Sequence, residues 1–103
     1  MVVDEKTFVK ACEAIGGEPY IFEDRMECED TEQTRQLVYN KKQNTFFDMR
    51  WTTRGKVAMH VVENVDSISV GPSDETMIVK KGDISLIYGK VFDLTSLWVG
   101  RLR

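Results

Sequence analysis

Histidine and cysteine, on which many catalytic and metal sites depend, are scarce in this 103-residue chain, which has one histidine and two cysteines. His60 has no second histidine with which to hold a zinc ion, and Cys12 and Cys28 lack the short spacing of a zinc motif. The seven glycines form no loop of the kind that cradles phosphates. We therefore expect no cofactor, no metal site and no enzymatic activity.

Long apolar stretches are also missing. No run approaches the roughly 20 residues that a membrane helix needs, and the N-terminus MVVDEKTF has no basic region followed by an apolar segment. Without a visible secretory signal, we expect a cytoplasmic protein. Free, buried thiols are then the expectation for Cys12 and Cys28. A Cys12–Cys28 disulfide is the alternative.

The chain has room for one hydrophobic core, so a single domain over 1–103 is expected. Its N-terminal segment predicts a helix, because apolar residues recur there at helical spacing after Asp4, a suitable capping residue. The apolar stripe consists of Phe8, Ala11, Cys12 and Ile15. Gly16-Gly17 and Pro19 favour the end of this helix.

After Pro19 the apolar residues alternate, and turn signals recur at roughly 8–12-residue spacing, which is typical of a meandering antiparallel sheet. These patterns predict an α+β fold with the N-terminal helix packed on a strongly bent antiparallel sheet of six or seven short strands. For the last segment, DLTSLWVGRLR, a short C-terminal helix capped by Asp93 is slightly favoured over a strand.

The segment TFFDMRWTT (45–53) has two distinct faces if it forms a strand. Phe47, Met49 and Trp51 share one face and are predicted to enter the core. The outward face then carries Phe46 and Arg50, with Asp48 between them. On the following strand, His60 is expected to be a half-buried sheet residue, because no acid or nucleophile partner is visible for it.

An acidic stretch, FEDRMECEDTE (22–32), contains six acids and one base. Residues 1–32 carry ten acids and three bases, a net charge of −7, whereas 33–103 carry seven acids and eleven bases, a net charge of +4. A solvated surface is the simplest interpretation. The functional hypothesis is that these carboxylates hold a basic partner. The predicted partner-binding residues are Glu23, Asp24, Glu27, Glu29 and Asp30.

A basic and aromatic segment, NKKQNTFFDMRWTTRGK (40–56), suggests a different function. Aromatic faces that stack on bases, with cations that follow phosphates, are the means by which proteins hold single-stranded nucleic acid. The candidate nucleic-acid-binding residues are Lys41, Lys42, Phe46, Arg50, Arg54 and Lys56. The overall net charge of −3 argues against a dedicated nucleic-acid-binding protein.

Leu97-Trp98-Val99 near the C-terminus can complete the core or anchor a second subunit, so a homo-oligomer through the Trp98 region is an alternative to core packing. The leading functional expectation is a small non-enzymatic protein-interaction or regulatory module. It would use its acidic surface to bind another protein with a basic surface, without contact with a membrane. Nucleic-acid binding through the 40–56 hairpin is the alternative.

Overall fold

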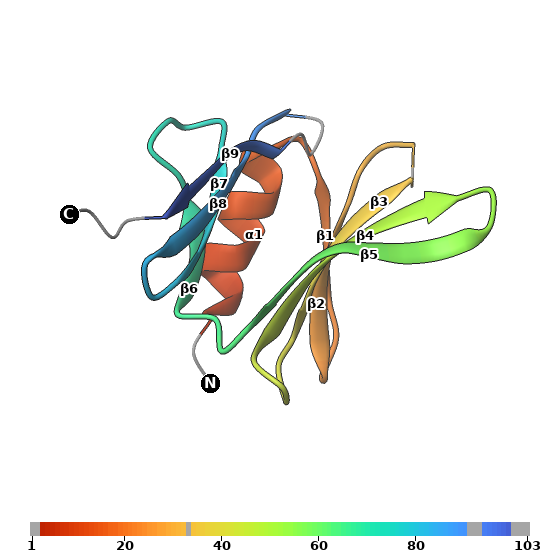
Figure 1. Cartoon of the computed structure of the whole chain (residues 1–103), viewed down its shortest axis with the longest axis horizontal. Coiled ribbons are helices and arrows are strands. Elements are labelled where there is room, and N and C mark those ends of the chain that lie inside the picture. The colour runs from red at the N-terminus through yellow and green to blue at the C-terminus, as the bar shows by residue number, and fades with distance from the viewer. Residues whose placement is uncertain (1–2, 33, 91–93, 100–103) are drawn as a thin grey trace.

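In its described residues the protein has one helix between two antiparallel sheets, as Figure 1 shows for the computed structural model. The structure describes residues 3–32, 34–90 and 94–99, with no side chains described in the last of these ranges. In this part of the chain the elements are α1 (Glu5–Ala14), β1 (Glu18–Ile21), β2 (Arg25–Glu29), β3 (Arg35–Asn40), β4 (Thr45–Thr52), β5 (Gly55–Glu63), β6 (Ser67–Val70), β7 (Met77–Lys81), β8 (Ile84–Tyr88) and β9 (Leu94–Val99).

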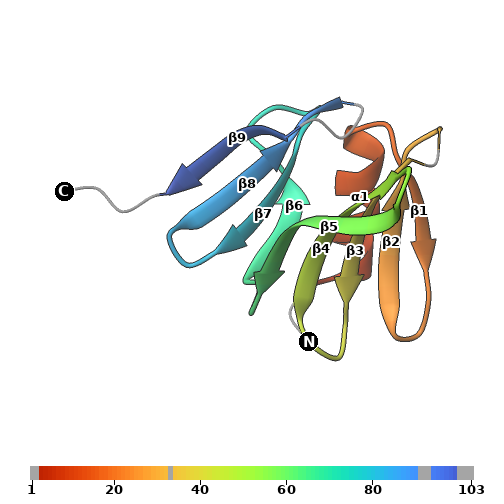
Figure 2. The ribbon, with the colours of Figure 1, turned by 45° about the vertical axis from the view of Figure 1, so that its right-hand side comes forward.

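The strands pair with their sequence neighbours in two separate sheets. The first has the order β1-β2-β3-β4-β5 and the second the order β6-β7-β8-β9, and Figure 2 shows them as distinct layers. The α+β class is therefore confirmed, but the prediction of a single sheet with six or seven strands is wrong. The break falls at Asn64, whose positive φ of 57° turns the chain away from β5. Val65 then enters the core that the helix and both sheets share.

The helix forms as its sequence predicts. The Asp4 carboxylate accepts a hydrogen bond from the backbone N–H of Thr7 at 3.0 Å, which caps the first turn. The predicted stripe is fully buried, from Phe8 to Ile15. Gly16 follows with a φ of 82°, a left-handed conformation that glycine adopts without strain.

Cys12 and Cys28 form a disulfide that joins α1 to β2. The prediction of two free thiols is therefore wrong, and the alternative is correct. Both positions were predicted to be buried, and both are. Burial on facing surfaces of a helix and a strand brought the two sulfur atoms together, which composition alone does not reveal.

The C-terminal segment Leu94–Val99 is strand β9, which pairs with β8, so the predicted C-terminal helix is wrong. The apolar residues of this segment fit the spacing of a helix and of a strand equally well. As a strand it satisfies the backbone N–H and C=O groups along the edge of β8, which a helix would leave unpaired. The Trp98 side chain lies outside the described residues. The homo-oligomer through the Trp98 region therefore stays a prediction.

Strand β4 presents the opposite face to the core from the one its sequence predicts. Phe46 and Asp48 are fully buried, whereas Phe47 and Met49 are half-buried and Trp51 is 51% exposed. The apolar residues on the two sides of β4 are nearly balanced. The burial of Asp48 therefore depends on polar partners from other strands, which are described below.

Candidate interaction surface

The five-stranded sheet has one face against α1 and another turned away from it, which we call the outer face. The strand register places Tyr20, Glu27, Val38, Phe47 and Val61 opposite one another in a row that crosses all five strands of the outer face. A second row runs beside it. Its members are Glu18, Glu29, Gln36, Met49 and Ala58.

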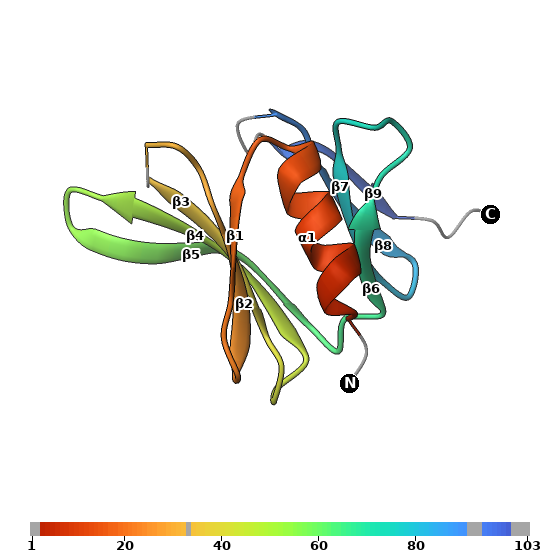
Figure 3. The ribbon, with the colours of Figure 1, turned by 180° about the vertical axis from the view of Figure 1, so that it is seen from behind.

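The outer face is not covered by any other element of the described structure, as the views from both sides in Figures 1 and 3 show. Large apolar side chains on or beside it are well exposed: Trp51 51%, Val61 49%, Phe22 41% and Tyr20 40%. A shallow depression of about 260 Å³ on this face is lined in part by Val38, Phe47 and Met49.

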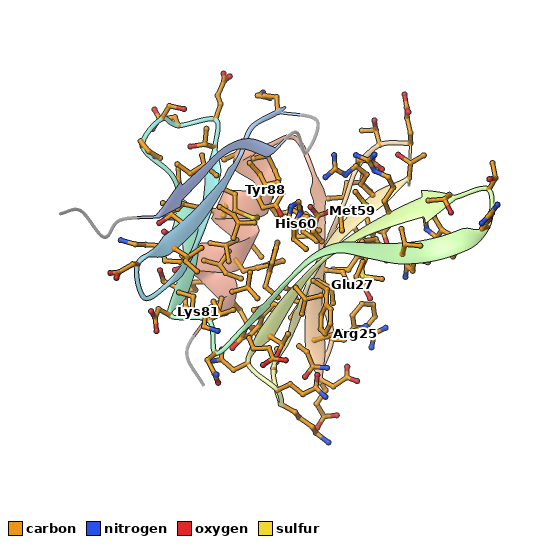
Figure 4. The ribbon with its side chains drawn as sticks, viewed as in Figure 1. Arg25, Glu27, Met59, His60, Lys81 and Tyr88 are labelled. Carbon is orange, nitrogen blue, oxygen red and sulfur yellow. A yellow bond between two sulfur atoms is a disulfide. The ribbon has the colours of Figure 1, made fainter. Side chains whose placement is uncertain are left out.

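Two acids of the predicted partner-binding set lie on this face, but both have partners. Glu27 accepts a hydrogen bond from Arg25 Nε at 2.6 Å, and Glu29 accepts one from the Gln36 amide at 2.7 Å. Figure 4 shows Arg25 and Glu27 on the side of the sheet away from the helix. Arg25 also pairs with Asp24 at 3.0 Å, so one guanidinium neutralises part of the acidic stretch.

The remaining two acids lie in turns. Asp30 accepts hydrogen bonds from the backbone N–H and the hydroxyl of Thr34, both at 2.8 Å, and so stabilises the loop between β2 and β3. Glu23 is exposed and makes no hydrogen bond or ion pair with another described residue. The structure therefore brings only part of the predicted set onto one surface.

Neighbouring side chains respond to the negative charge that remains. The Tyr20 hydroxyl donates a hydrogen bond to Glu18 at 2.9 Å, and this bond, with the charges of Glu18 and Glu29, raises the pKa of Tyr20 above its ordinary value. The hydrogen bond from Arg25 to Glu27 likewise raises the pKa of Arg25. The β1–β2 side of the outer face is thus electronegative.

The predicted nucleic-acid-binding residues do not form one surface. Phe46 is buried, so the prediction that it faces outward is wrong. Lys41 donates hydrogen bonds to Glu5 and to the backbone carbonyl of Phe22, both at 2.8 Å. Lys42 is exposed near the turn after β3.

The other three cations are exposed near the tip of the β4–β5 hairpin, which extends well beyond the helix in Figure 1. These cations are Arg50, Arg54 and Lys56. The Lys56 ammonium lies 5.1 Å from the centre of the Trp51 ring, a cation–π contact. Trp51 had been assigned to the core, so this exposed aromatic residue was missed.

A buried polar cluster around Asp48 connects the two sheets. The fully buried Asp48 carboxylate accepts hydrogen bonds from Arg35 at 3.3 Å and from the Tyr88 hydroxyl at 2.9 Å. His60 Nδ1 lies 3.1 Å from the same carboxylate. Figure 4 shows His60 and Tyr88 close together between the sheets. Burial and the Asp48 charge raise the pKa of Tyr88 far above its ordinary value.

The expected half-burial of His60 is confirmed, although its acid partner was missed. A groove of about 450 Å³ borders this histidine and is lined mainly by apolar side chains of β5 and β8. Asp48 and His60 have the arrangement of an acid–base pair. In the described residues, however, the hydrogen bonds of His60 include no serine, threonine or cysteine that could act as a nucleophile.

Within the described residues, no three histidine, cysteine or acidic side chains are grouped so that they could hold a metal ion. The same part of the chain contains no helix with the length and apolar character needed to span a membrane. Comparison with known proteins found no matching family, no matching curated protein and no matching solved structure. Any functional proposal therefore depends on the surfaces themselves.

Proposed function

We propose that this protein is a small non-enzymatic interaction module whose outer face binds another protein through apolar and basic side chains of that partner. The observation that carries this proposal is the uncovered row across the sheet, with Val38, Phe47 and Val61 on its three adjacent strands. This proposal extends the acidic-surface hypothesis, because it adds the apolar residues of the outer face to the carboxylates that contact the partner.

An antiparallel sheet with one solvated face usually alternates apolar residues toward the core with polar residues toward water. Here the solvated side of β4 carries Phe47, Met49 and Trp51 instead. Contiguous apolar patches on protein surfaces commonly mark interaction sites. Aromatic residues such as Trp51 are also the type that dominates binding energy at protein interfaces.

Charge favours a basic partner over an acidic one. Glu18 and Glu29 stand opposite each other in the second row, and Glu23 lies free in the turn at the other end of the β1–β2 hairpin. Lysine or arginine side chains of a partner could form charge-assisted hydrogen bonds with these carboxylates. The same charges would accelerate the encounter, and salt would weaken that effect.

The test begins with a display library of short random peptides selected against the oxidised protein. We expect enrichment of peptides that combine aromatic or aliphatic residues with lysine or arginine, and amide shift changes that map to the outer face. Phe47→Ala should weaken the selected peptides by about thirtyfold, since truncating a central aromatic anchor costs about 2 kcal/mol. Glu29→Lys should slow their association.

Matched controls are available on other surfaces. Ile84→Ala removes an exposed apolar side chain of the second sheet, and Glu75→Lys makes the same charge change in the β6–β7 loop. Both controls should leave peptide affinity unchanged. Peptides whose shift changes map to another surface, or whose affinity ignores Phe47→Ala, would contradict the proposal.

Nucleic-acid binding is a second candidate, and the observation in its favour is the exposed Trp51 with the Lys56 ammonium over its ring, on a hairpin that also carries Arg50 and Arg54. We expect a labelled single-stranded DNA to bind at low salt and to lose affinity with a slope of about 0.7 per phosphate contacted. Arg54→Glu should reduce that affinity, whereas Lys80→Glu, an equal charge change on β7, should not. A DNA that fails to bind even at low salt removes this candidate.

A further inference from the structure

The unpaired edge of β5 is complementary to itself. We propose that two copies of this chain associate about a two-fold axis by antiparallel pairing of their β5 strands, which joins the two five-stranded sheets into one. This inference does not rest on the proposed function. It concerns the edge of the sheet, whereas the proposed function concerns the outer face.

Strand β5 has one neighbour, β4, and therefore leaves one side of its backbone without a ladder partner in the described sheet. It is also the longest strand, with nine residues. Such an edge presents free N–H and C=O groups that readily pair with another strand. Val57, Met59 and Val61 are 40%, 48% and 49% exposed, so the edge is apolar as well as unpaired.

A register irregularity in β5 decides which residues share a face. The pairing with β4 shifts between Asp48 and Met49, so that Met59 has no partner on β4. Met59 is therefore an extra residue, and the alternation of inward and outward side chains along β5 shifts by one position there. The outward-facing residues of β5 are Lys56, Ala58, Val61 and Glu63, which pair with Trp51, Met49, Phe47 and Thr45.

One antiparallel register matches these faces and also the charges. When Lys56 of one copy stands opposite Glu63 of the other, both side chains lie on the outer side of the joined sheet. In the same register Ala58 meets Val61, again on the outer side, and Val57 meets Val62 on the inner side. Each contact occurs twice because of the two-fold axis, as an isologous interface requires.

The charges at the two ends of β5, Lys56 and Glu63, favour a second copy of this chain as the partner strand. Opposite charges directly across a strand pair stabilise the pairing, and like charges oppose it. Glu63 and Lys56 are exposed and form no ion pair with another described residue, and the Lys56 ammonium lies over the Trp51 ring. Both groups are therefore available to a partner strand.

The groove beside β5 is consistent with this arrangement. Its far wall contains Ile84 and Leu86 of β8, and Ile84 is 39% exposed. A strand added to β5 would direct its inner apolar side chains toward this wall. Pairing would also remove an apolar edge that otherwise favours open-ended aggregation, because a two-fold contact is closed.

The experiment is sedimentation velocity over a range from micromolar to millimolar protein. We expect a reversible dimer, weakened about tenfold by Lys56→Glu and about tenfold by Glu63→Lys, because each change places like charges at two symmetric contacts. An equimolar mixture of the two variants should form a heterodimer with near wild-type affinity, since both contacts then join opposite charges. The double variant should also recover.

Controls separate this interface from general charge effects and from misfolding. Lys80→Glu and Glu75→Lys repeat the charge changes away from β5 and should leave dimerisation unchanged. Hydrogen exchange of the wild-type protein should show β5 amides whose protection increases with protein concentration. A chain that stays monomeric throughout, β5 amides whose protection ignores concentration, or a mixture that fails to recover overturns the proposal. None of these results would contradict peptide binding at the outer face, so the two proposals are tested independently.

Discussion

Asp48 shows how a single charged side chain can define the interior of this protein. An ionised carboxylate is costly to bury unless it is paired and hydrogen-bonded, and Asp48 has Arg35, His60 and Tyr88 as partners. These partners come from β3, β5 and β8, so the cluster ties the second sheet to the first. The inward direction of Asp48 also forces Phe47 and Met49 outward, which creates the outer face.

Tyr88 makes this cluster sensitive to alkaline pH. Burial is the main cause that raises the pKa of Tyr88 in the folded state, whereas a tyrosine in the unfolded chain has a pKa of about 10. Above that pH the folded state holds a proton that the unfolded state has released, so the unfolding free energy falls as pH rises. Tyr88→Phe should remove up to about 1.4 kcal/mol per pH unit of this decline.

The measurement is urea unfolding of the wild-type and Tyr88→Phe proteins on both sides of pH 10. Near neutral pH the variant should be less stable by about 1.5–3 kcal/mol, the usual value of a hydrogen bond to a charged group. The two stability curves should then converge as pH rises. Parallel curves would show that the Tyr88 hydroxyl ionises as readily in the folded protein as in the unfolded chain.

The connection between α1 and β2 combines apolar packing with a covalent bond. The Cys12–Cys28 disulfide closes a loop with a sequence separation of 16 residues. In the chain-entropy account, a loop of about that length is worth roughly 3 kcal/mol, because the crosslink restricts the unfolded chain. The helix would otherwise be held on the first sheet by the burial of its apolar stripe.

Reduction of the disulfide should therefore lower the unfolding free energy by about 3 kcal/mol at neutral pH, as measured by urea unfolding with and without reductant. The Cys12→Ala/Cys28→Ala variant should resemble the reduced protein and should not respond to reductant. Two titratable thiols in the denatured, unreduced protein would contradict this expectation. The cytoplasmic location stays a prediction, although disulfides are commoner in oxidising compartments.

The β4–β5 hairpin brings together the features that bear most on function. Its outward side contributes to the apolar row, its tip carries the exposed cations, and its free edge offers the proposed dimer contact. The hairpin extends beyond α1 (Figure 1), and Trp51, near the end of β4, remains 51% exposed.

Across the whole molecule, the uneven charge of the sequence survives only in part. Arg25 lies within the acidic stretch and pairs with two of its carboxylates, and Lys41 reaches back to Glu5. The electronegative area that remains lies on the β1–β2 side of the outer face, next to exposed apolar residues. A two-fold dimer through β5 would join two outer faces in one sheet, so a partner with repeated binding segments would gain avidity.

The sequence alone determined the features that depend on neighbouring residues. The helix with its cap and buried stripe, and the meander of antiparallel strands after Pro19, follow from local periodicity and turn chemistry. The tertiary structure decided the division into two sheets, the disulfide, and the fate of the C-terminal segment. Each of these depends on a partner distant in the chain, which a periodic pattern does not identify.

The face of β4 is the clearest example of that division. Counting apolar residues favoured Phe47 and Trp51 for the core, but the buried residues are Phe46 and Asp48. Only the fold could bring Tyr88, 40 residues along the chain, to the Asp48 carboxylate. Because a charged group can be buried when it is paired and hydrogen-bonded, the side of β4 that faces outward was decided by contacts that sequence alternation does not contain.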